Sequence, residues 1–521
     1  MRRIALVAIG LSLLLVVLVG LLQRPGSPVS PLQQVKDRYA RKPMPVVDHT
    51  KFSALQRNFR RPQDVTLACL SCHTERHKEV MASSHWNWER EEYIPGRGIR
   101  RIGKKNILNN YCIGVSSNLE SCDKCHAGYG FVGPGFDFGE PGNIDCLACH
   151  DRSGAYERAG NGLPAPTVNL TQVAQRVGRP QRANCGACHF AGGGGNNVKH
   201  GDLEMTLIDP SREVDVHMTP QGADLQCVDC HEAPNHKMLG KVYSVSSMNR
   251  NRSTCEQCHG ATPHGGGILD EHTLKVACQT CHIPTYAKDA ATKMSWDWST
   301  AGRLRDGQPF EEKDADGNVT YASIKGTFTW GKNVKPEYAW FNGTAGHYLL
   351  GDAVPEASVL QVNSLNGSYA DPDARIVPVK IHRGRQIYDP GTGMLVQPKL
   401  FAPEKGAGAF WKDFDWDTAS REGMKTVGLP YSGRHAFIDT EMYWPVNHMV
   451  APRESAVACV ECHTRTGSRL DNLRDFYLPG RDNDPLVEQL GMVSILGALG
   501  GATLHGLARI AAARRRKGGD A

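Results

Sequence analysis

Two long apolar stretches lie near the ends of the chain, and only short, interrupted ones lie between them. Residues 4–22 follow two arginines, which is typical of an export signal, and the run is also long enough to cross a bilayer. Because no small-residue cleavage site follows, we favour an uncleaved anchor over a cleaved signal. Residues 490–508 precede the basic residues 514–517, which predicts a C-terminal anchor with a cytoplasmic end. An Ala/Gly-rich soluble helix is the alternative.

The middle of the chain favours short elements, because 55 Gly and 30 Pro interrupt regular structure. Turn residues separate the segments up to about residue 290, so we expect short helices there. The turn dipeptide Asp316-Gly317 lies between Asp314 and the run 319–321, and the run 326–330 follows. This pattern predicts a hairpin. The pattern predicts a mainly α protein with much irregular structure and a small β-containing insertion.

The cysteines change this picture, since 16 of the 17 fall into eight C-x-x-C pairs that are each followed directly by His. This is the attachment motif of c-type haem: two thiols bind the vinyl groups and the imidazole ligates the iron. The motifs are Cys69/Cys72/His73, Cys122/Cys125/His126, Cys146/Cys149/His150, Cys185/Cys188/His189, Cys227/Cys230/His231, Cys255/Cys258/His259, Cys278/Cys281/His282 and Cys459/Cys462/His463.

Zinc or disulfides would leave the eight histidines unexplained, because thiolate zinc sites do not need His after every pair. We therefore predict eight covalently bound haems, in a multihaem cytochrome c organised by haem packing. The net charge of +6 is too mild to indicate nucleic-acid binding. The predicted layout is an N-terminal signal or anchor (1–25), a seven-haem block (45–290), a haem-free, partly β insertion that supplies ligands (291–455), the eighth haem segment (456–470) and a C-terminal transmembrane anchor with a basic tail (486–521).

Each iron takes a second axial ligand, and two imidazoles make it an electron carrier, whereas catalysis needs a position that is open or weakly held. Beyond the eight motif histidines, the chain has enough histidines for seven or eight distal ligands. Our preferred distal set is His85, His200, His217, His236, His264, His272 and His448, with His49 and His382 in reserve.

The seventeenth cysteine, Cys112, belongs to no motif and follows Asn109, Asn110 and Tyr111. One interpretation is a buried thiol that behaves as a small apolar side chain. The other is a reactive thiol, because a nearby cationic iron would lower its pKa. The residues alone leave both open.

In the order of its motifs, the chain resembles the octahaem tetrathionate reductase family. The likeness covers about residues 47–465 and rests on the eight motifs together with the segments 109–112, 192–203, 215–218, 276–284 and 442–452. The resemblance implies that the second haem, on Cys122, Cys125 and His126, is the active one and that Lys199 is its distal ligand. It also implies a pocket that contains Cys112 and Asn109 or Asn110, with Asn196 just ahead of the lysine.

From these observations we expect a membrane-anchored octahaem reductase whose haem body faces the periplasm from the inner membrane. Electrons would come from a quinol-linked membrane cytochrome or a small periplasmic cytochrome, and the small anionic substrate would be tetrathionate, with nitrite or hydroxylamine as further candidates. The alternatives are a hydroxylamine-oxidising or nitrite-reducing octahaem enzyme and a non-catalytic electron conduit. Five basic residues precede the second motif, and they would either attract anions or form a solvated loop. They are Arg97, Arg100, Arg101, Lys104 and Lys105.

Overall fold

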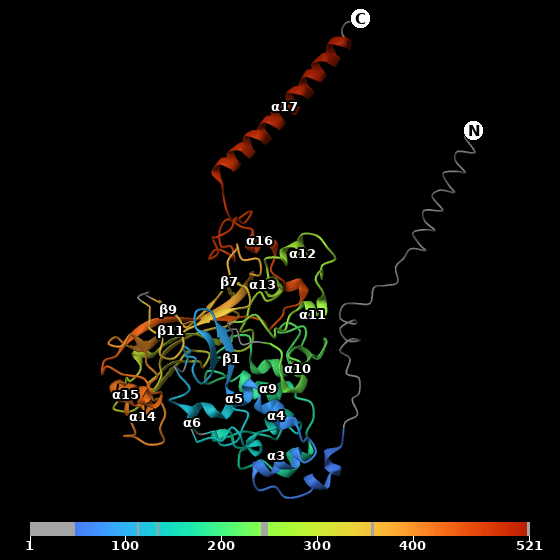
Figure 1. The fold of residues 1–521 in the computed structure, drawn as a ribbon. Helices are drawn as coiled ribbons and strands as arrows, with labels where there is room; N and C mark the ends of the chain where they lie inside the picture. The colour runs from blue at the N-terminus through green and yellow to red at the C-terminus, as the bar shows by residue number, and fades with distance from the viewer. Residues whose placement is uncertain are drawn as a thin grey trace, which may run out of the picture.

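The computed structural model describes residues 47–111, 114–131, 133, 135–240, 248–355 and 359–517. The predicted N-terminal segment 1–25 and Cys112 therefore lie outside the described residues. Short helices and loops make up one side of the molecule, a twisted sheet makes up the other, and a long C-terminal helix leaves the body (Figure 1).

Most helices in the first half are one or two turns long, and several end on a motif histidine, as the turn-rich sequence predicts. The α-helices are α3 (Pro62–Leu70), α4 (Arg76–Met81), α5 (Ser84–Asn87), α6 (Leu119–Cys122), α7 (Leu147–His150), α8 (Leu170–Gln175), α9 (Arg182–His189), α10 (Cys227–Cys230), α11 (Glu256–His259), α12 (Ile268–His272), α13 (Cys278–His282), α14 (Phe410–Asp413), α15 (Trp416–Thr426), α16 (Cys459–Cys462) and α17 (Pro485–Lys517). Short 3-10 helices join them, among them η3 (Asp123–Cys125), η7 (Pro234–His236) and η9 (Trp298–Thr300).

The description as mainly α is not confirmed, because residues 292–445 build a nine-stranded sheet rather than a small β insertion. The path order is β4-β5-β6-β3-β11-β13-β9, and β7 and β12 also pair with β11. The strands are β3 (Thr292–Asp297), β4 (Glu311–Lys313), β5 (Val319–Ala322), β6 (Gly326–Gly331), β7 (Glu337–Phe341), β9 (Val359–Gln361), β11 (Arg375–Asp389), β12 (Met394–Leu395) and β13 (Ala436–Pro445). Two small sheets pair β1 (Glu89–Ile94) with β2 (Gly98–Gly103), and β8 (Ala345–His347) with β10 (Asn363–Leu365).

The 15-residue strand β11 explains the size of this sheet. It pairs with β13 over ten residues, from Val379 to Tyr388, and also with β3, β7 and β12. Its side chains are buried at most positions and join two apolar clusters, one that contains Ile387 and one that contains Val377, Val379 and Ile381. The predicted hairpin is confirmed within the sheet: β4 pairs with β5 across the Asp316-Gly317 turn, β5 pairs with β6, and Gly317 has a φ of 84°.

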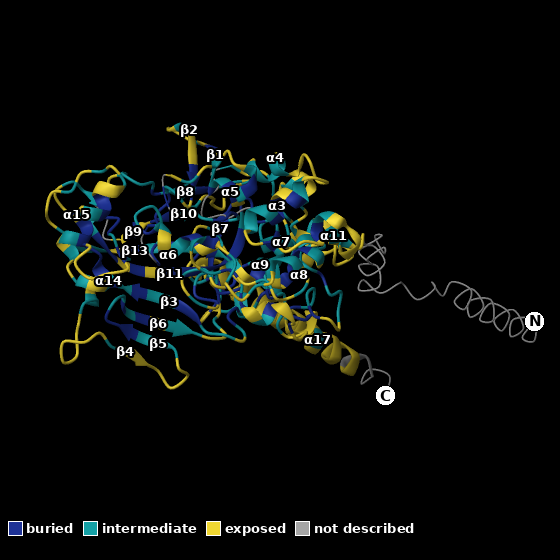
Figure 2. Ribbon diagram, turned by 90° about the horizontal axis from the view of Figure 1, so that it is seen from below, coloured by how far each residue is buried: buried dark blue, intermediate teal, exposed yellow. Residues whose placement is uncertain are grey.

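The largest apolar core packs between this sheet and α14 and α15. It includes Trp296, Trp298, Ile387 and Phe410, which are buried, and Phe410 stacks on Trp416 with the ring centroids 3.7 Å apart. In Figure 2, β3, β6 and β11 are coloured mostly as buried or intermediate. The sheet therefore has an interior made of its own side chains.

Helix α17 is exposed along its length (Figure 2). In the described part of the chain it is the one helix long and apolar enough to cross a membrane, over Pro485–Arg514, and its apolar 18-residue stretch has a mean hydropathy of 1.5. It contains the apolar stretch that the sequence pattern identified at residues 490–508.

Candidate functional site

The short-helix side encloses a continuous cavity of about 2870 Å³. Pockets for one small ligand usually measure about 300–1,000 Å³, so this space suits several large groups. Cysteines from seven of the eight motifs line it, from Cys125 of the second to Cys462 of the eighth. The residue types predicted to carry haem therefore surround one shared space.

The first motif lies at the surface, outside this space. The sequence predicts the same haem-binding role for Cys72 as for the other motif cysteines, but the structure leaves Cys72 and His73 exposed and away from the cavity wall. The reason is local: α3 packs its buried side chains against a small apolar cluster and ends at Leu70, so the chain turns toward solvent just before Cys72. His73 is in none of the imidazole pairs found among the described residues. The attachment of Cys72 to a haem stays a prediction.

Six motif histidines each face a second imidazole across the large cavity. Two imidazoles bound end-on to one metal through bonds of about 2.0–2.1 Å place their ring centroids about 6.3 Å apart. The pairs and their centroid separations are His150 and His236, 6.2 Å; His189 and His85, 6.2 Å; His231 and His448, 6.2 Å; His259 and His217, 6.0 Å; His282 and His264, 6.3 Å; and His463 and His272, 6.2 Å. The spacing in all six pairs fits one iron between the rings.

Hydrogen bonds at Nδ1 orient many of these rings. When the outer nitrogen of an imidazole is bonded to a carbonyl or carboxylate, Nε2 is directed at the metal and the ring stays in one tautomer. Backbone carbonyls accept from His150 (Gly178 O, 2.9 Å), His231 (Leu239 O, 2.9 Å), His272 (Ile268 O, 2.6 Å) and His463 (Pro479 O, 2.7 Å). Carboxylates pair with His236 (Glu79, 2.8 Å), His264 (Asp270, 3.0 Å) and His448 (Asp202, 3.1 Å).

The His448–Asp202 pair is the most deeply buried of these. Burial alone would lower the pKa of His448, but the hydrogen bond and charge of Asp202 outweigh it and raise that pKa. Elsewhere burial dominates and lowers the pKa of His189 to about 3, which keeps the ring neutral. A neutral imidazole is the form that binds a metal.

Contacts between cysteines show which motifs are neighbours. Four pairs of cysteine side chains lie next to each other: Cys69 and Cys146, Cys125 and Cys188, Cys185 and Cys227, and Cys255 and Cys278. Electrostatic contacts add Cys149 with Cys185, Cys230 with Cys258, and Cys281 with Cys462. The motifs therefore follow the spatial order first, third, fourth, fifth, sixth, seventh and eighth, and the second lies beside the fourth.

The second motif differs from the six paired ones. Nε2 of His126 is hydrogen-bonded to the carbonyl oxygen of Trp86 at 2.6 Å, and the ring is fully buried. Burial lowers the pKa of His126 to about 4. Aromatic rings surround it: Trp86, Trp88, Phe131, Phe136 and Phe138. Among the described residues no second imidazole faces it, and its metal-binding nitrogen does not point into the cavity.

Two further histidines lie outside the paired arrangement. His200, which we predicted as a distal ligand, packs edge-on against Trp444 at 4.8 Å instead of facing a motif histidine. The reserve candidate His382 is buried, stacks on Tyr111 at 3.8 Å and bonds Asn110 through Nδ1 at 2.9 Å. Both therefore belong to the packing around β11 and β13 rather than to the paired imidazoles.

Lys199 lines the cavity, with its ammonium 4.8 Å from the ring centroid of Trp444. Its backbone carbonyl accepts hydrogen bonds from the Tyr111 hydroxyl at 2.6 Å and from Lys380 Nζ at 3.0 Å. Any side chain at Gly193, whose φ is 83°, would meet Val198 and Tyr111, which explains the glycine-rich loop before the lysine. The structure thus brings the 109–111 segment and Lys199 together.

The asparagines divide into two groups. Asn110 is buried and donates to the carbonyl of His382 at 2.7 Å, and the carbonyl of Asn109 accepts from Gln386 at 2.8 Å, so both lie on the Lys199 side of β11. Asn196 is exposed, and its side chain accepts from the backbone N–H of Met205 at 2.8 Å. The structure does not bring Asn196 into this cluster.

Sequence reasoning did not identify Lys380. It is completely buried on β11 and donates to Val198 O, Lys199 O and Thr292 Oγ1 at 3.0, 3.0 and 2.6 Å. Burial lowers its pKa well below the ordinary lysine value. The sequence does contain a signal for it, since a lysine within the apolar run 376–381 indicates a buried lysine. A buried cation needs a dedicated set of hydrogen-bond acceptors.

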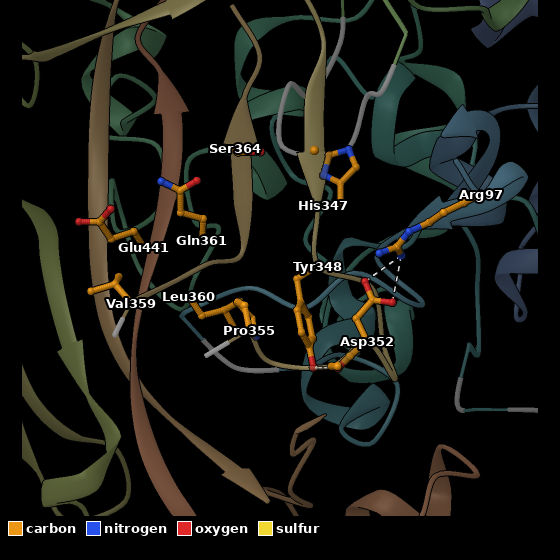
Figure 3. A pocket seen from close by; sticks show the side chains of 12 residues that line it. Arg97, His347, Tyr348, Asp352, Pro355, Val359, Leu360, Gln361, Ser364 and Glu441 are labelled. Carbon is orange, nitrogen blue, oxygen red and sulfur yellow. Dashed lines mark hydrogen bonds and ion pairs between the residues drawn. The ribbon is translucent and has the colours of Figure 1, made fainter. Parts of the chain in front are cut away.

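The basic segment that we considered as an anion attractor is largely paired with acids on and near the β1–β2 hairpin. Arg101 contacts Glu89 and Glu91, Lys105 contacts Glu89, and Arg97 pairs with Asp352. Figure 3 shows the last pair at the edge of a separate cavity of about 730 Å³ beside β8 and β9. This pairing weakens the electrostatic argument for a wide anion funnel.

Comparisons with known proteins agree with the geometry. Residues 293–466 match the family model for bacterial cytochrome c. The crystal structure of octaheme cytochrome c from Shewanella oneidensis aligns with a TM-score of 0.75 and 40% identity, over 85% of this chain and 98% of that one. An uncharacterized protein of Archaeoglobus fulgidus is 28% identical over 221 residues, which is 32% of this chain and 73% of that protein.

The paired imidazoles and the cysteine-lined cavity define a multihaem c-type cytochrome, a redox protein with covalently bound haem. The chain belongs to the octahaem cytochrome c family. The six histidine pairs fit the axial positions of such haems, whereas the second motif, as described, holds its histidine turned toward Trp86.

Proposed function

We propose that the protein holds eight haems and is a reductase that acts on tetrathionate, with nitrite or hydroxylamine as further substrates. The reaction takes place at the second motif with Lys199 as the replaceable distal ligand. The haem body faces the periplasm, and the chain is anchored in the inner membrane.

A single asymmetry supports this proposal. Six motif histidines face a second imidazole, whereas His126 faces none among the described residues. Lys199 and Cys125 of the second motif both line the large cavity. Iron with two imidazoles suits electron transfer, and a site without them suits binding of a substrate. The resemblance to octahaem tetrathionate reductases identifies the lysine as the ligand.

The bound haem supplies one-electron redox chemistry, and the chain supplies position and environment. Tyr111 and Lys380 fix the Lys199 backbone from two directions, so the amine is presented from a rigid loop. The aromatic shell around His126 keeps water from that side of the site. The ammonium group of Lys104, at the cavity wall, favours a small anion.

The order of neighbouring motifs supports an electron route that runs from the eighth motif to the fourth and then to the second. The third and first motifs form a branch from the fourth. A quinol-linked membrane cytochrome or a small periplasmic cytochrome supplies the electrons.

Lys199→Ala tests the active site. With a soluble reductant, we expect at least a 100-fold loss of tetrathionate turnover and a change in ligand-field spectra at one iron. Lys313→Ala, which removes an exposed lysine on β4, is the matched control and leaves both unchanged. Nitrite and hydroxylamine are measured alongside tetrathionate.

A non-catalytic conduit is the second candidate, and the six imidazole pairs favour it, because an iron held by two imidazoles suits electron transfer. Unchanged spectra in Lys199→Ala, together with no response of any iron to cyanide or azide, would establish the conduit and overturn the reductase.

A further inference from the structure

We infer that electrons from the membrane enter the protein at the eighth motif, because the segment that orients its histidine leads directly into α17. This inference rests on the proposed function of a membrane-anchored reductase and adds its point of electron entry.

The histidine of this motif is held by the chain that precedes the helix. His463 Nδ1 donates to the carbonyl oxygen of Pro479 at 2.7 Å. The next residue, Gly480, has a φ of 84°, and a side chain there would come within 2.8 Å of the His463 carbonyl. The backbone at 479–480 therefore packs directly against the ligand histidine.

The two residues after Gly480 fix this segment to the body. The guanidinium of Arg481, which is buried, donates to the carbonyls of Leu470, Leu473 and Phe476. Asp482 accepts from the backbone N–H of Leu478 and pairs with Arg481, both at 2.6 Å. A buried guanidinium with a full set of acceptors is costly to disturb, so the segment is rigid up to Asp482.

Only Asn483 and Asp484 separate this anchored segment from α17. Asp484 begins the helix by accepting from the backbone N–H groups of Leu486 and Val487 at 3.0 and 3.2 Å. Arg465, two residues after the ligand histidine, pairs with Glu488 in the first turn of α17. The helix is thus attached to the eighth motif at two points and has no flexible linker.

Three apolar side chains near the motif are exposed to solvent. Leu274, Val460 and Tyr477 are 70%, 71% and 64% exposed, and none of them lines the large cavity. Each is within three residues of His272, His463 or Pro479. Figure 1 shows α12 and α16 at the end of the body from which α17 leaves. If α17 spans the membrane, as proposed, these three side chains are held near the bilayer surface.

The reductant belongs to the class of membrane cytochromes that are reduced by quinol. A single electron passes from the donor's ferrous haem to the site formed by His272 and His463. No bond is made or broken in this step, and no proton is transferred. The neighbour order then gives the route from the eighth motif inward to the fourth and second.

A photochemical experiment tests the entry point without substrate turnover. The full-length, haem-loaded protein is placed in phosphatidylcholine vesicles that carry a lipid with a photoexcitable ruthenium headgroup, and haem reduction is followed after a flash. His272→Met raises the reduction potential of the eighth site and changes its spectrum. His236→Met does the same at the third motif, on the branch, and is the matched control.

We expect the earliest absorbance change to carry the altered spectrum in His272→Met and the wild-type spectrum in His236→Met. An earliest change that carries the altered spectrum of His236→Met, or no flash-driven reduction in any vesicle sample, would overturn the inference.

A second variant leaves every ligand in place. Ten Gly/Ser residues inserted between Asn483 and Asp484 add about 17 Å of average reach, and the same insert between Asp316 and Gly317 is the control. We expect the first variant to slow flash reduction at least tenfold while its ground-state spectrum and vesicle flotation stay normal, and the control to behave as wild type. An unchanged rate would refute a fixed entry point. Tetrathionate turnover with a soluble reductant, measured on both, reports separately on the proposed function.

Discussion

The two sides of the molecule fill their interiors differently. In the sheet region, residues 292–445, tryptophan, phenylalanine and aliphatic side chains pack into the largest apolar cluster. In the haem-binding region, built on helices α3–α13 and α16, the main feature is a cavity of about 2870 Å³, and the largest cluster there has only seven buried residues. The first region completes its core with side chains, whereas the second needs its cofactors to do so.

Buried polar groups hold the haem-binding region together in place of a large apolar core. Asp145 is fully buried and pairs with Arg158 at 2.9 Å, and it accepts from the hydroxyls of Tyr129 and Tyr156 at 3.1 and 2.8 Å. Burial raises the pKa of Asp145, although Arg158 and both tyrosine hydrogen bonds oppose that shift. Such a network specifies one arrangement of short loops that propensity alone would leave undefined.

Blocking haem attachment is the strongest way to separate the two regions. We expect the haem-free chain to keep hydrogen-exchange protection in β11 and β13 and to lose it in α7, α9 and α13. Without haem, the helices around the large cavity have no cofactor to pack against, whereas the sheet keeps its own side-chain core. Exchange measured by mass spectrometry on the haem-free and haem-loaded chains checks this. Equal protection of both regions in the haem-free chain would contradict it.

Asp145→Ala is expected to have the next largest effect, because it leaves the Arg158 guanidinium buried without its carboxylate. Removing one partner of a buried ion pair typically costs about 3–5 kcal/mol. The loss should appear as faster exchange around α7 and η3, while β11 stays protected. Asp314→Ala, at the exposed β4–β5 turn, is the control and should leave the haem-binding region unchanged.

The sequence identified the chemistry of the haem-binding region well, because C-x-x-C-H is a local pattern with one dominant use. Six of the seven preferred distal histidines, all except His200, face a motif histidine in the structure. Their partners could not be assigned from spacing: His448 meets His231, more than 200 residues earlier. The exposure of Cys72 could not be predicted either, because all eight motifs have the same pattern in the sequence. Such features depend on how the whole chain folds around the cofactors.

The sheet was underestimated for a different reason. The Asp-Gly turn marked one hairpin, but β11 runs as a nearly continuous buried strand with internal Lys380, His382 and Gly384, which hide the strand pattern. Those polar residues are present because β11 supports the Lys199 loop and the 109–111 segment. The local pattern is therefore weakest where the strand serves the candidate site.

Ile387→Val makes a smaller change in the sheet core. Deleting one buried methylene group typically costs about 0.5–1.5 kcal/mol, because the void is only partly filled by its neighbours. We expect faster exchange in β11 and β13 with haem spectra and turnover unchanged. A change in the haem spectra would show that the two regions are more tightly coupled than their separate interiors indicate.

The smallest expected effects compare two carboxylate–histidine pairs that differ in burial. Asp202→Asn replaces a charged acceptor of His448 with a neutral one, which removes about 1 kcal/mol of stabilisation of the oxidised metal and raises the reduction potential of that site by on the order of 40 mV. The same change at Asp270, which pairs with His264, should shift the potential less, because Asp270 lies in the exposed segment 260–272, where solvent screens the charge, whereas Asp202 is buried. Potentiometric titration followed by absorbance measures the reduction potentials of both variants. A shift in Asp270→Asn equal to or larger than that in Asp202→Asn would show that burial does not set the strength of these pairs.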